Sequence, residues 1–222
     1  MNEPPGFERH SEAEAAELIA DPDERARREA ANGLRQFDHV LELIEYSLDP
    51  ERPFRLRLST ILGLNRVALE GIHPNAGGFR PAGVEIKGSK HEPPPNYLLP
   101  SLLEELCDYV NDNWDGQSAI HLAAYVMWRI NWIHPFADGN GRTSRALSYL
   151  ILCVRLGYRL PGGLTIPELI ADNKKPYYDA LEAADVAFDN GAVDVSEMEN
   201  LLDGLLAKQL MEIHRSATGA ED

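Results

Sequence analysis

The feature that most constrains this chain is a polar turn, residues 134–145, set between two apolar stretches. The stretch before it, residues 119–133, is apolar on nearly every side, and residues 146–156 after it are again mostly apolar. Pro135 disfavours helical backbone at the residue before it, so the sequence predicts a helix that ends at His134. We therefore expect two buried helices, joined by this turn, in the middle of the fold.

The turn holds residues suited to binding an anion. Gly139, Asn140 and Gly141 favour a tight turn of exposed backbone N–H groups, with the amide of Asn140 as a further donor. A second helix is expected to start directly after them, and a helix start carries unpaired N–H donors and the positive end of the dipole. Arg142 and Arg145 share one face of that helix, so we expect the turn to bind a polyphosphate.

An imidazole and a carboxylate accompany this anion site. His134 can accept a proton from a nucleophile, because an ordinary imidazole titrates near about 6.5. Asp138 is a candidate ligand for Mg²⁺, which takes one or two carboxylates together with phosphate oxygens and water. Capping of the next helix is the alternative for Asp138, since a cap needs the same residue type at the same place.

The turn resembles the signature of the Fic (Fic/Doc) family at every fixed position, namely His134, Phe136, Asp138, Gly139, Asn140, Gly141, Arg142 and Arg145. The resemblance implies an all-α fold, a Fic-type helical bundle around a central buried helix–loop–helix, with a short β-hairpin flap. It also implies a protein adenylyltransferase that moves AMP from ATP to a Ser, Thr or Tyr hydroxyl of a target protein, using ATP and Mg²⁺.

The same resemblance gives each polar residue of the turn a role. His134 would be the general base, and Asp138 would hold Mg²⁺ between the α- and β-phosphates. Arg142 would hold the β-phosphate and Arg145 the γ-phosphate. Family members with Lys in place of the second glycine bind the nucleotide reversed and transfer phosphate, so Gly141 favours AMP transfer.

A later stretch, residues 177–185, resembles the helix that lies beside the adenine in this family. Tyr177 and Tyr178 stand where a tyrosine stacks near the base, with core packing as the alternative for both. The position where the family often has an Asn that bonds the base is Asp185. A carboxylate accepts hydrogen bonds but cannot donate them, so the choice of nucleotide stays open.

Residues 72–97 are rich in Gly and Pro, and a short part of them alternates apolar with polar residues: Val84, Glu85, Ile86 and Lys87. This pattern predicts a short β-hairpin or an extended flap near residues 79–90. In the family, such a flap clamps the target segment by strand addition, which tolerates varied side chains. A plain surface loop is the alternative.

Many family members carry an inhibitory Ser/Thr-x-x-x-Glu-Gly/Asn helix, and no stretch of this chain matches it. Glu29 is a divergent candidate for its glutamate. Otherwise an antitoxin-like partner supplies the glutamate, assembly as a homo-oligomer provides control, or control is absent. Two other activities stay open: a hydrolase that removes AMP, which needs a Glu to position water, and a non-catalytic nucleotide-binding interaction module.

Length and charge bound the remaining possibilities. The 222 residues suit one domain, with an N-terminal extension over 1–33 that is partly disordered or helical, a Fic domain over 34–215 and a frayed tail over 216–222. Gly33 is expected to break the helical pattern. The formal charge of −15 disfavours nucleic acid and anionic membranes as partners. With no secretion signal and no long apolar run, we expect a cytoplasmic protein.

Overall fold

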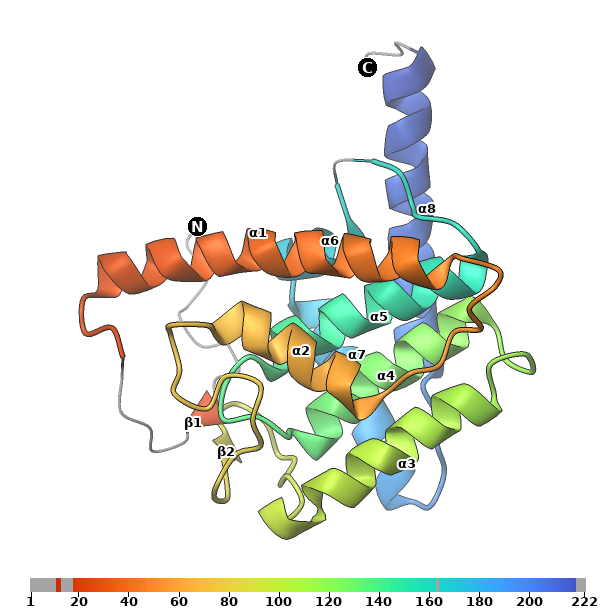
Figure 1. Ribbon diagram of the computed structural model, residues 1–222. Helices are drawn as coiled ribbons and strands as arrows, with labels where there is room; N and C mark the ends of the chain where they lie inside the picture. The colour runs from red at the N-terminus through yellow and green to blue at the C-terminus, as the bar shows by residue number, and fades with distance from the viewer. Residues whose placement is uncertain (1–10, 13–17, 163, 219–222) are drawn as a thin grey trace, which may run out of the picture.

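The computed structural model describes residues 11–12, 18–162 and 164–218 of the chain, and these residues form a helical bundle beside one small sheet (Figure 1). The elements in chain order are β1 (Ser11–Glu12), α1 (Pro22–Ser47), α2 (Leu58–Leu69), β2 (Glu85–Ile86), the short 3-10 helix η1 (Asn96–Leu98), α3 (Leu99–Asp112), α4 (Ala119–Ile133), α5 (Asn140–Leu156), α6 (Ile166–Asp172), α7 (Lys175–Asp189) and α8 (Ser196–Thr218). None of the described helices is long and apolar enough to cross a membrane. The prediction of an all-α fold is confirmed.

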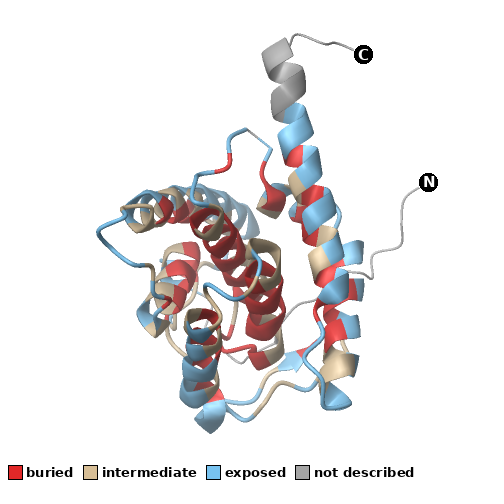
Figure 2. Cartoon of the chain, turned by 90° about the vertical axis from the view of Figure 1, so that its right-hand side faces the viewer, coloured by how far each residue is buried: buried red, intermediate tan, exposed pale blue. Residues whose placement is uncertain are grey.

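Helices α4 and α5 form the centre of the bundle. Helices α1 and α2 pack on α5, whereas α3, α7 and α8 pack on α4. Figure 2 shows the two central helices buried along most of their length, while the C-terminal part of α8 extends beyond the body. This burial follows from their near-continuous apolar sequences, which leave no face that favours water.

Helix α1 begins within the segment predicted to be an N-terminal extension over residues 1–33. Asp21 caps it, because its Oδ1 accepts the N–H groups of Asp23 and Glu24 at 2.9 Å each, and Pro22 occupies the first turn. The helix then continues through Gly33, so the predicted break there is wrong.

Side-chain contacts between α1 and α2 explain why α1 continues past that glycine. An exposed glycine inside a helix costs only about 1 kcal/mol relative to alanine. On either side of it, the buried amides of Asn32 and Gln36 donate to the α2-side carbonyls of Glu70 and Leu64, each at 2.9 Å. These bonds hold α1 along α2 as one helix.

Most other boundaries agree with the sequence. The capping box of Thr165 and Glu168 starts α6, with the Thr165 N–H at 2.7 Å from Glu168 Oε2. Helix α2 begins at Leu58, and residues 53–57 before it are not helical. The tail predicted from Ser216 is helical to residue 218, and residues 219–222 lie outside the described part.

The small sheet pairs two segments that are far apart in the sequence. β2, in the predicted flap, runs antiparallel to β1, with Ser11 opposite Ile86 and Glu12 opposite Glu85. The flap therefore has the extended form of the prediction, and its strand partner comes from near the N-terminus instead of from a hairpin within residues 79–90.

Candidate active site

The turn between α4 and α5 is fixed by its own backbone and one amide side chain. His134 follows the last residue of α4 with a left-handed φ of 50°, and its N–H donates to Ile130 O at 2.9 Å. The amide of Asn140 accepts the Phe136 N–H at 3.0 Å and donates to Phe136 O at 2.8 Å. Asn140 is 2% exposed and braces the turn through its amide, and its role as a side-chain donor to phosphate stays a prediction.

The imidazole of His134 is buried yet faces the pocket beside the turn. It is 6% exposed, and it lines the same pocket as residues 139–141. Its Nδ1 lies 3.2 Å from Asn131 O, so we assign the proton to Nδ1 and the acceptor role to Nε2. Burial lowers the pKa of His134 from its ordinary value to about 4. The ring is therefore neutral at pH 7 and carries a lone pair that can accept a proton.

The start of α5 has the backbone features predicted for an anion site. Gly139 precedes the helix with a φ of 77°, and a Cβ at this position would lie 3.0 Å from Asn65 Nδ2, so glycine is required. The first ladder bond of the helix runs from the Thr143 N–H to Gly139 O at 2.9 Å. The N–H groups of Asn140 and Gly141 precede that ladder and belong to the positive end of the helix dipole.

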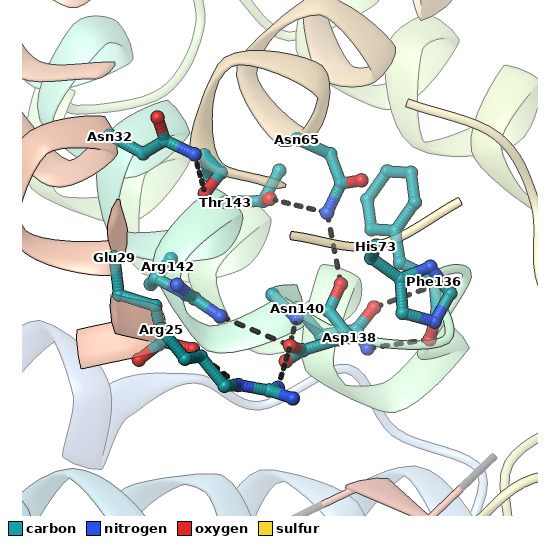
Figure 3. Close-up of polar contacts among 12 residues, drawn as sticks. Arg25, Glu29, Asn32, Asn65, His73, Phe136, Asp138, Asn140, Arg142 and Thr143 are labelled. Carbon is teal, nitrogen blue, oxygen red and sulfur yellow. Dashed lines mark hydrogen bonds and ion pairs between the residues drawn. The ribbon is translucent and has the colours of Figure 1, made fainter. Parts of the chain in front are cut away.

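The carboxylate of Asp138 is held by several cationic and backbone donors, as Figure 3 shows. Its Oδ1 accepts the Gly139 N–H, but the N-cap of α5 is Gly139 itself and no side chain caps the helix, so the capping alternative for Asp138 is wrong. Its Oδ2 lies 3.2 Å from Arg142 Nη2 and 3.8 Å from Arg25 Nη2. The side chain is 33% exposed and so stays accessible from the pocket.

These contacts suit a Mg²⁺ ion that is held mostly by its nucleotide. Among the described residues, no three His, Cys, Asp or Glu side chains gather to hold a metal on their own. A single accessible carboxylate fits Mg²⁺, because this ion commonly takes one or two carboxylates and completes its shell with phosphate oxygens and water. Asp138 is the residue that would hold it.

A pocket of about 630 Å³ brings the predicted site residues together. It is lined by four cationic side chains, Arg25, Arg142, Arg145 and Lys174, and by three carboxylates, Glu29, Asp138 and Asp185. Its remaining lining comes from Ile86, Ser89, His91, Asn131, His134, Gly139, Asn140, Gly141, Tyr177, Tyr178 and Leu181. The pocket thus concentrates positive charge in a chain whose formal charge is −15. This local excess favours an anionic ligand.

The pocket lining also includes the residues predicted to lie beside a base. Tyr177 is buried, and its hydroxyl lies 2.7 Å from Asn131 Nδ2 and 3.2 Å from Ser144 Oγ. It therefore packs in the core and links α7 to α4 and α5. Tyr178 is half-buried and lines the pocket. Asp185 Oδ1 accepts the indole N–H of Trp128 at 2.8 Å, which fixes this carboxylate at the pocket wall.

Two buried residues that the sequence analysis missed support the turn from outside it. Asn65 of α2 donates to Asp138 O at 3.0 Å and to Thr143 Oγ1 at 3.3 Å, while its Oδ1 accepts the Gly77 N–H. Arg80, at the start of the predicted flap, donates from Nε to His134 O at 2.8 Å. Both contacts join residues distant in sequence, and no local pattern reveals them.

The flap reaches the pocket through one of its four predicted residues. Ile86 is buried and lines the pocket, whereas Val84, Glu85 and Lys87 are not among the lining residues. Glu29 of α1, the divergent candidate for an inhibitory glutamate, also lines the pocket, and its carboxylate lies 3.3 Å from Arg25 Nε.

Comparison with known proteins finds that the chain is similar to Fic proteins. The model of the Fic/DOC family matches residues 55–152. The chain is 33% identical over 129 residues to the protein adenylyltransferase Fic of Drosophila willistoni, covering 57% of this chain and 25% of that protein. It is 31% identical over 157 residues to the protein of the same name from Aedes aegypti, covering 69% of this chain and 29% of that protein.

A solved structure agrees with the fold. A fragment of Fic-1 from C. elegans superposes with a TM-score of 0.67 at 23% identity, covering 91% of this chain and 55% of that chain. The chain spans only about a quarter of the length of the curated relatives it matches, 25% and 29% for the two insect proteins.

Proposed function

The chain belongs to the Fic/DOC family, and on this premise we propose that it transfers AMP from ATP to a hydroxyl side chain of a target protein. One observation carries the proposal: a neutral histidine, a metal-competent carboxylate and an anion-binding helix start line one pocket, and the flap residue Ile86 lines it too. A base, a phosphate site and a target-binding edge are what such a transfer requires.

The reaction follows from these positions. Nε2 of His134 accepts the proton of the target hydroxyl as its oxygen bonds to the α-phosphorus, and the bond from that phosphorus to pyrophosphate breaks. The backbone N–H groups at the start of α5, with Arg142 and Arg145, stabilise the charge that grows on the leaving pyrophosphate. When bound at Asp138, Mg²⁺ would neutralise further charge on the phosphates.

The low pKa of His134 suits this role once ATP is bound. Burial keeps the imidazole neutral before ATP binds, so it needs no deprotonation before it acts. The triphosphate brings negative charge into the pocket, and a nearby negative charge favours the protonated imidazolium. The base therefore becomes stronger when the substrate to be attacked is in place.

The test is incubation of cell lysate with Mg²⁺ and ATP that carries label on either the α- or the γ-phosphate. Wild-type protein should label target proteins from α-labelled ATP only, and His134→Ala should lose that labelling. His39→Ala is the matched control, since His39 is on the far part of α1 and does not line the pocket. Label from γ-labelled ATP, or ATP binding without any transfer, would contradict the proposal; the second result would indicate a non-catalytic nucleotide-binding module.

Removal of AMP from a modified protein is a second candidate, and the position of Glu29 favours it. This carboxylate lines the pocket that also holds His134, where it could orient a water molecule toward a phosphorus atom. An AMP-modified protein incubated with this chain should then release AMP. Glu29→Gln should abolish the release while leaving transfer from ATP measurable, and unchanged release would exclude the hydrolase.

A further inference from the structure

Arg25, near the start of α1, reaches the carboxylate of the turn from outside the segment that the family model matches. That match covers residues 55–152, whereas Arg25 Nη2 lies 3.8 Å from Asp138 Oδ2. We propose that Arg25 binds the pyrophosphate part of the nucleotide and adds a third guanidinium to those of Arg142 and Arg145. The inference rests on the proposed function, because it names a further residue that holds the leaving group of that transfer.

The position of Arg25 follows from the inward face of α1. The buried residues of this helix repeat at intervals of four: Asn32, Gln36, Val40 and Ile44. Steps of three and then four residues toward the N-terminus stay on the same face and lead to Glu29 and Arg25. Within residues 21–31 these two are half-buried, whereas all the others are exposed. The inward face of α1 therefore continues over the pocket, which both residues line.

Contacts with the end of α2 hold this part of α1 in place. The amide of Asn32, seven residues from Arg25, donates to Glu70 O at 2.9 Å and to Ala68 O at 3.2 Å. One turn further on, the guanidinium of Arg35 forms an ion pair with the carboxylate of Glu70. Arg25 thus belongs to a helix that is packed against its neighbour. A group on such an element loses less freedom when it binds a ligand than a group on a loose segment does.

Two guanidiniums converge on one carboxylate oxygen at the edge of the turn. Oδ2 of Asp138 lies 3.2 Å from Arg142 Nη2 and 3.8 Å from Arg25 Nη2. The carboxylate between them offsets their mutual repulsion. Asp138 is also the residue that would hold Mg²⁺, whose charge would weaken the attraction of this carboxylate for both guanidiniums. Phosphate oxygens beside the carboxylate are then the anions that both guanidiniums can bind.

This shared oxygen indicates which phosphates Arg25 can reach. Arg142, the other guanidinium at Asp138 Oδ2, is the residue expected from the family resemblance to hold the β-phosphate. The side chain of Arg25 is 34% exposed, so it can move from the carboxylate to a phosphate bound at Arg142. Pyrophosphate and ATP carry this phosphate, whereas AMP lacks it. Arg25 should therefore distinguish ligands by their number of phosphates.

A guanidinium suits the leaving group of the proposed transfer. It stays charged at neutral pH, and its paired N–H donors match two phosphate oxygens. Negative charge grows on pyrophosphate as its bond to the α-phosphorus breaks. The contact that strengthens binding of pyrophosphate would therefore stabilise the transition state as well.

The test measures binding of inorganic pyrophosphate, ATP and AMP to the purified full chain with Mg²⁺, by titration calorimetry. Arg25→Met removes the charge and keeps an apolar stem, so Kd for pyrophosphate and for ATP should each rise about tenfold or more. Kd for AMP should stay the same, and Arg25→Lys should recover part of the loss. The matched control is Arg27→Met, an exposed position of the same helix that does not line the pocket, and it should change none of the three values.

The ion pair with Glu29 requires a second comparison. Glu29 Oε1 lies 3.3 Å from Arg25 Nε, so Arg25→Met also leaves a carboxylate in the pocket that repels phosphate. The same substitution is therefore made in a Glu29→Gln background, where that repulsion is absent. Arg25→Met should still raise Kd for pyrophosphate there. No effect in this background would mean that Arg25 only neutralises Glu29, and would overturn the inference.

The remaining outcomes separate this inference from the proposed function. An equal loss for AMP and pyrophosphate would show that Arg25→Met disturbs the pocket as a whole, and an unchanged Kd for pyrophosphate would exclude Arg25 from the phosphate site. Either result overturns the inference and leaves the proposed transfer standing. Wild-type protein that binds neither ATP nor pyrophosphate would reject both.

Discussion

The guanidinium of Arg80 donates through Nε to the carbonyl oxygen of His134 at 2.8 Å, across 54 positions of sequence. The same side chain donates from Nη1 to Ala82 O at 2.8 Å and from Nη2 to Pro94 O, and it is 2% exposed. One buried arginine therefore joins the segment that carries the flap to the residue proposed as the base. This side chain positions the proposed target-binding edge relative to the proposed reaction centre.

Removal of the Arg80 donors should weaken both stability and transfer. Arg80→Met keeps much of the apolar stem but leaves three carbonyl groups without their charged donor, which should lower the free energy of unfolding by about 3 kcal/mol or more. Labelling by α-labelled ATP should fall as well. Urea unfolding and labelling rates measure the two effects. The exposed Arg55→Met should change stability by less than about 0.5 kcal/mol, and an equal loss in both variants would contradict this role.

Two glycine substitutions should change stability in opposite directions. Gly139→Ala forces a side chain onto a φ of 77° and brings its Cβ to 3.0 Å from Asn65 Nδ2, so it should cost about 1–3 kcal/mol. Gly33→Ala is inside α1, where a Cβ meets nothing within 4 Å, and should stabilise by about 0.5–1 kcal/mol. Thermal unfolding of both variants is the measurement. A stability change of the same sign in both variants would contradict the assignment of a strained backbone to Gly139 and a helical backbone to Gly33.

The turn was predictable from sequence because its chemistry is local. Pro135 ends α4, and the glycines around Asn140 start α5, so the convergence of His134 and Asp138 follows from neighbours in the chain. The role of the Asn140 amide did not follow, because a side chain four residues from Phe136 can either brace the turn or face a ligand. The folded geometry shows the bracing contacts, and a contact of the amide with phosphate stays a prediction.

The start of α1 could have been predicted from the sequence, whereas the contacts of Asn65 and Arg80 with the turn could not. Asp21 followed by Pro22 is a common helix start, and this signal outweighs the single break expected at Gly33. Asn65 and Arg80 act through contacts with residues 54 to 78 positions away. A periodicity or spacing argument compares near neighbours, so it contains no information on such pairs.

Stability should depend on pH through His134. The pKa of this buried imidazole is about 4 in the folded chain and near its ordinary value when unfolded. Between about pH 6.5 and 4, the unfolded state therefore binds a proton that the folded state does not, and the free energy of unfolding falls as the pH falls, by up to about 3 kcal/mol.

The variant His134→Asn isolates this dependence. Asparagine tolerates the left-handed backbone at this position but does not titrate. Chemical unfolding of both proteins without nucleotide or metal, at several pH values from 7 to 4, gives the difference between them. Wild type should lose stability relative to the variant on acidification, and a difference that stays constant with pH would show that the imidazole is not buried as described.

Asp185 should set which base the pocket accepts. Its Oδ1 is already bonded to the indole N–H of Trp128, and a carboxylate offers the base no donor. Asp185→Asn keeps an acceptor for Trp128 and adds an N–H₂ group, which a ring nitrogen of adenine can accept but the N1–H of guanine cannot. One added hydrogen bond is worth about 1 kcal/mol, so kcat/KM for ATP should rise roughly fivefold, whereas kcat/KM for GTP should fall.

The ratio of the two kcat/KM values is measured by AMP and GMP incorporation. The matched control is Asp189→Asn, an exposed position on the same helix. A ratio that moves equally in both variants, or in neither, would place the base somewhere other than beside Asp185.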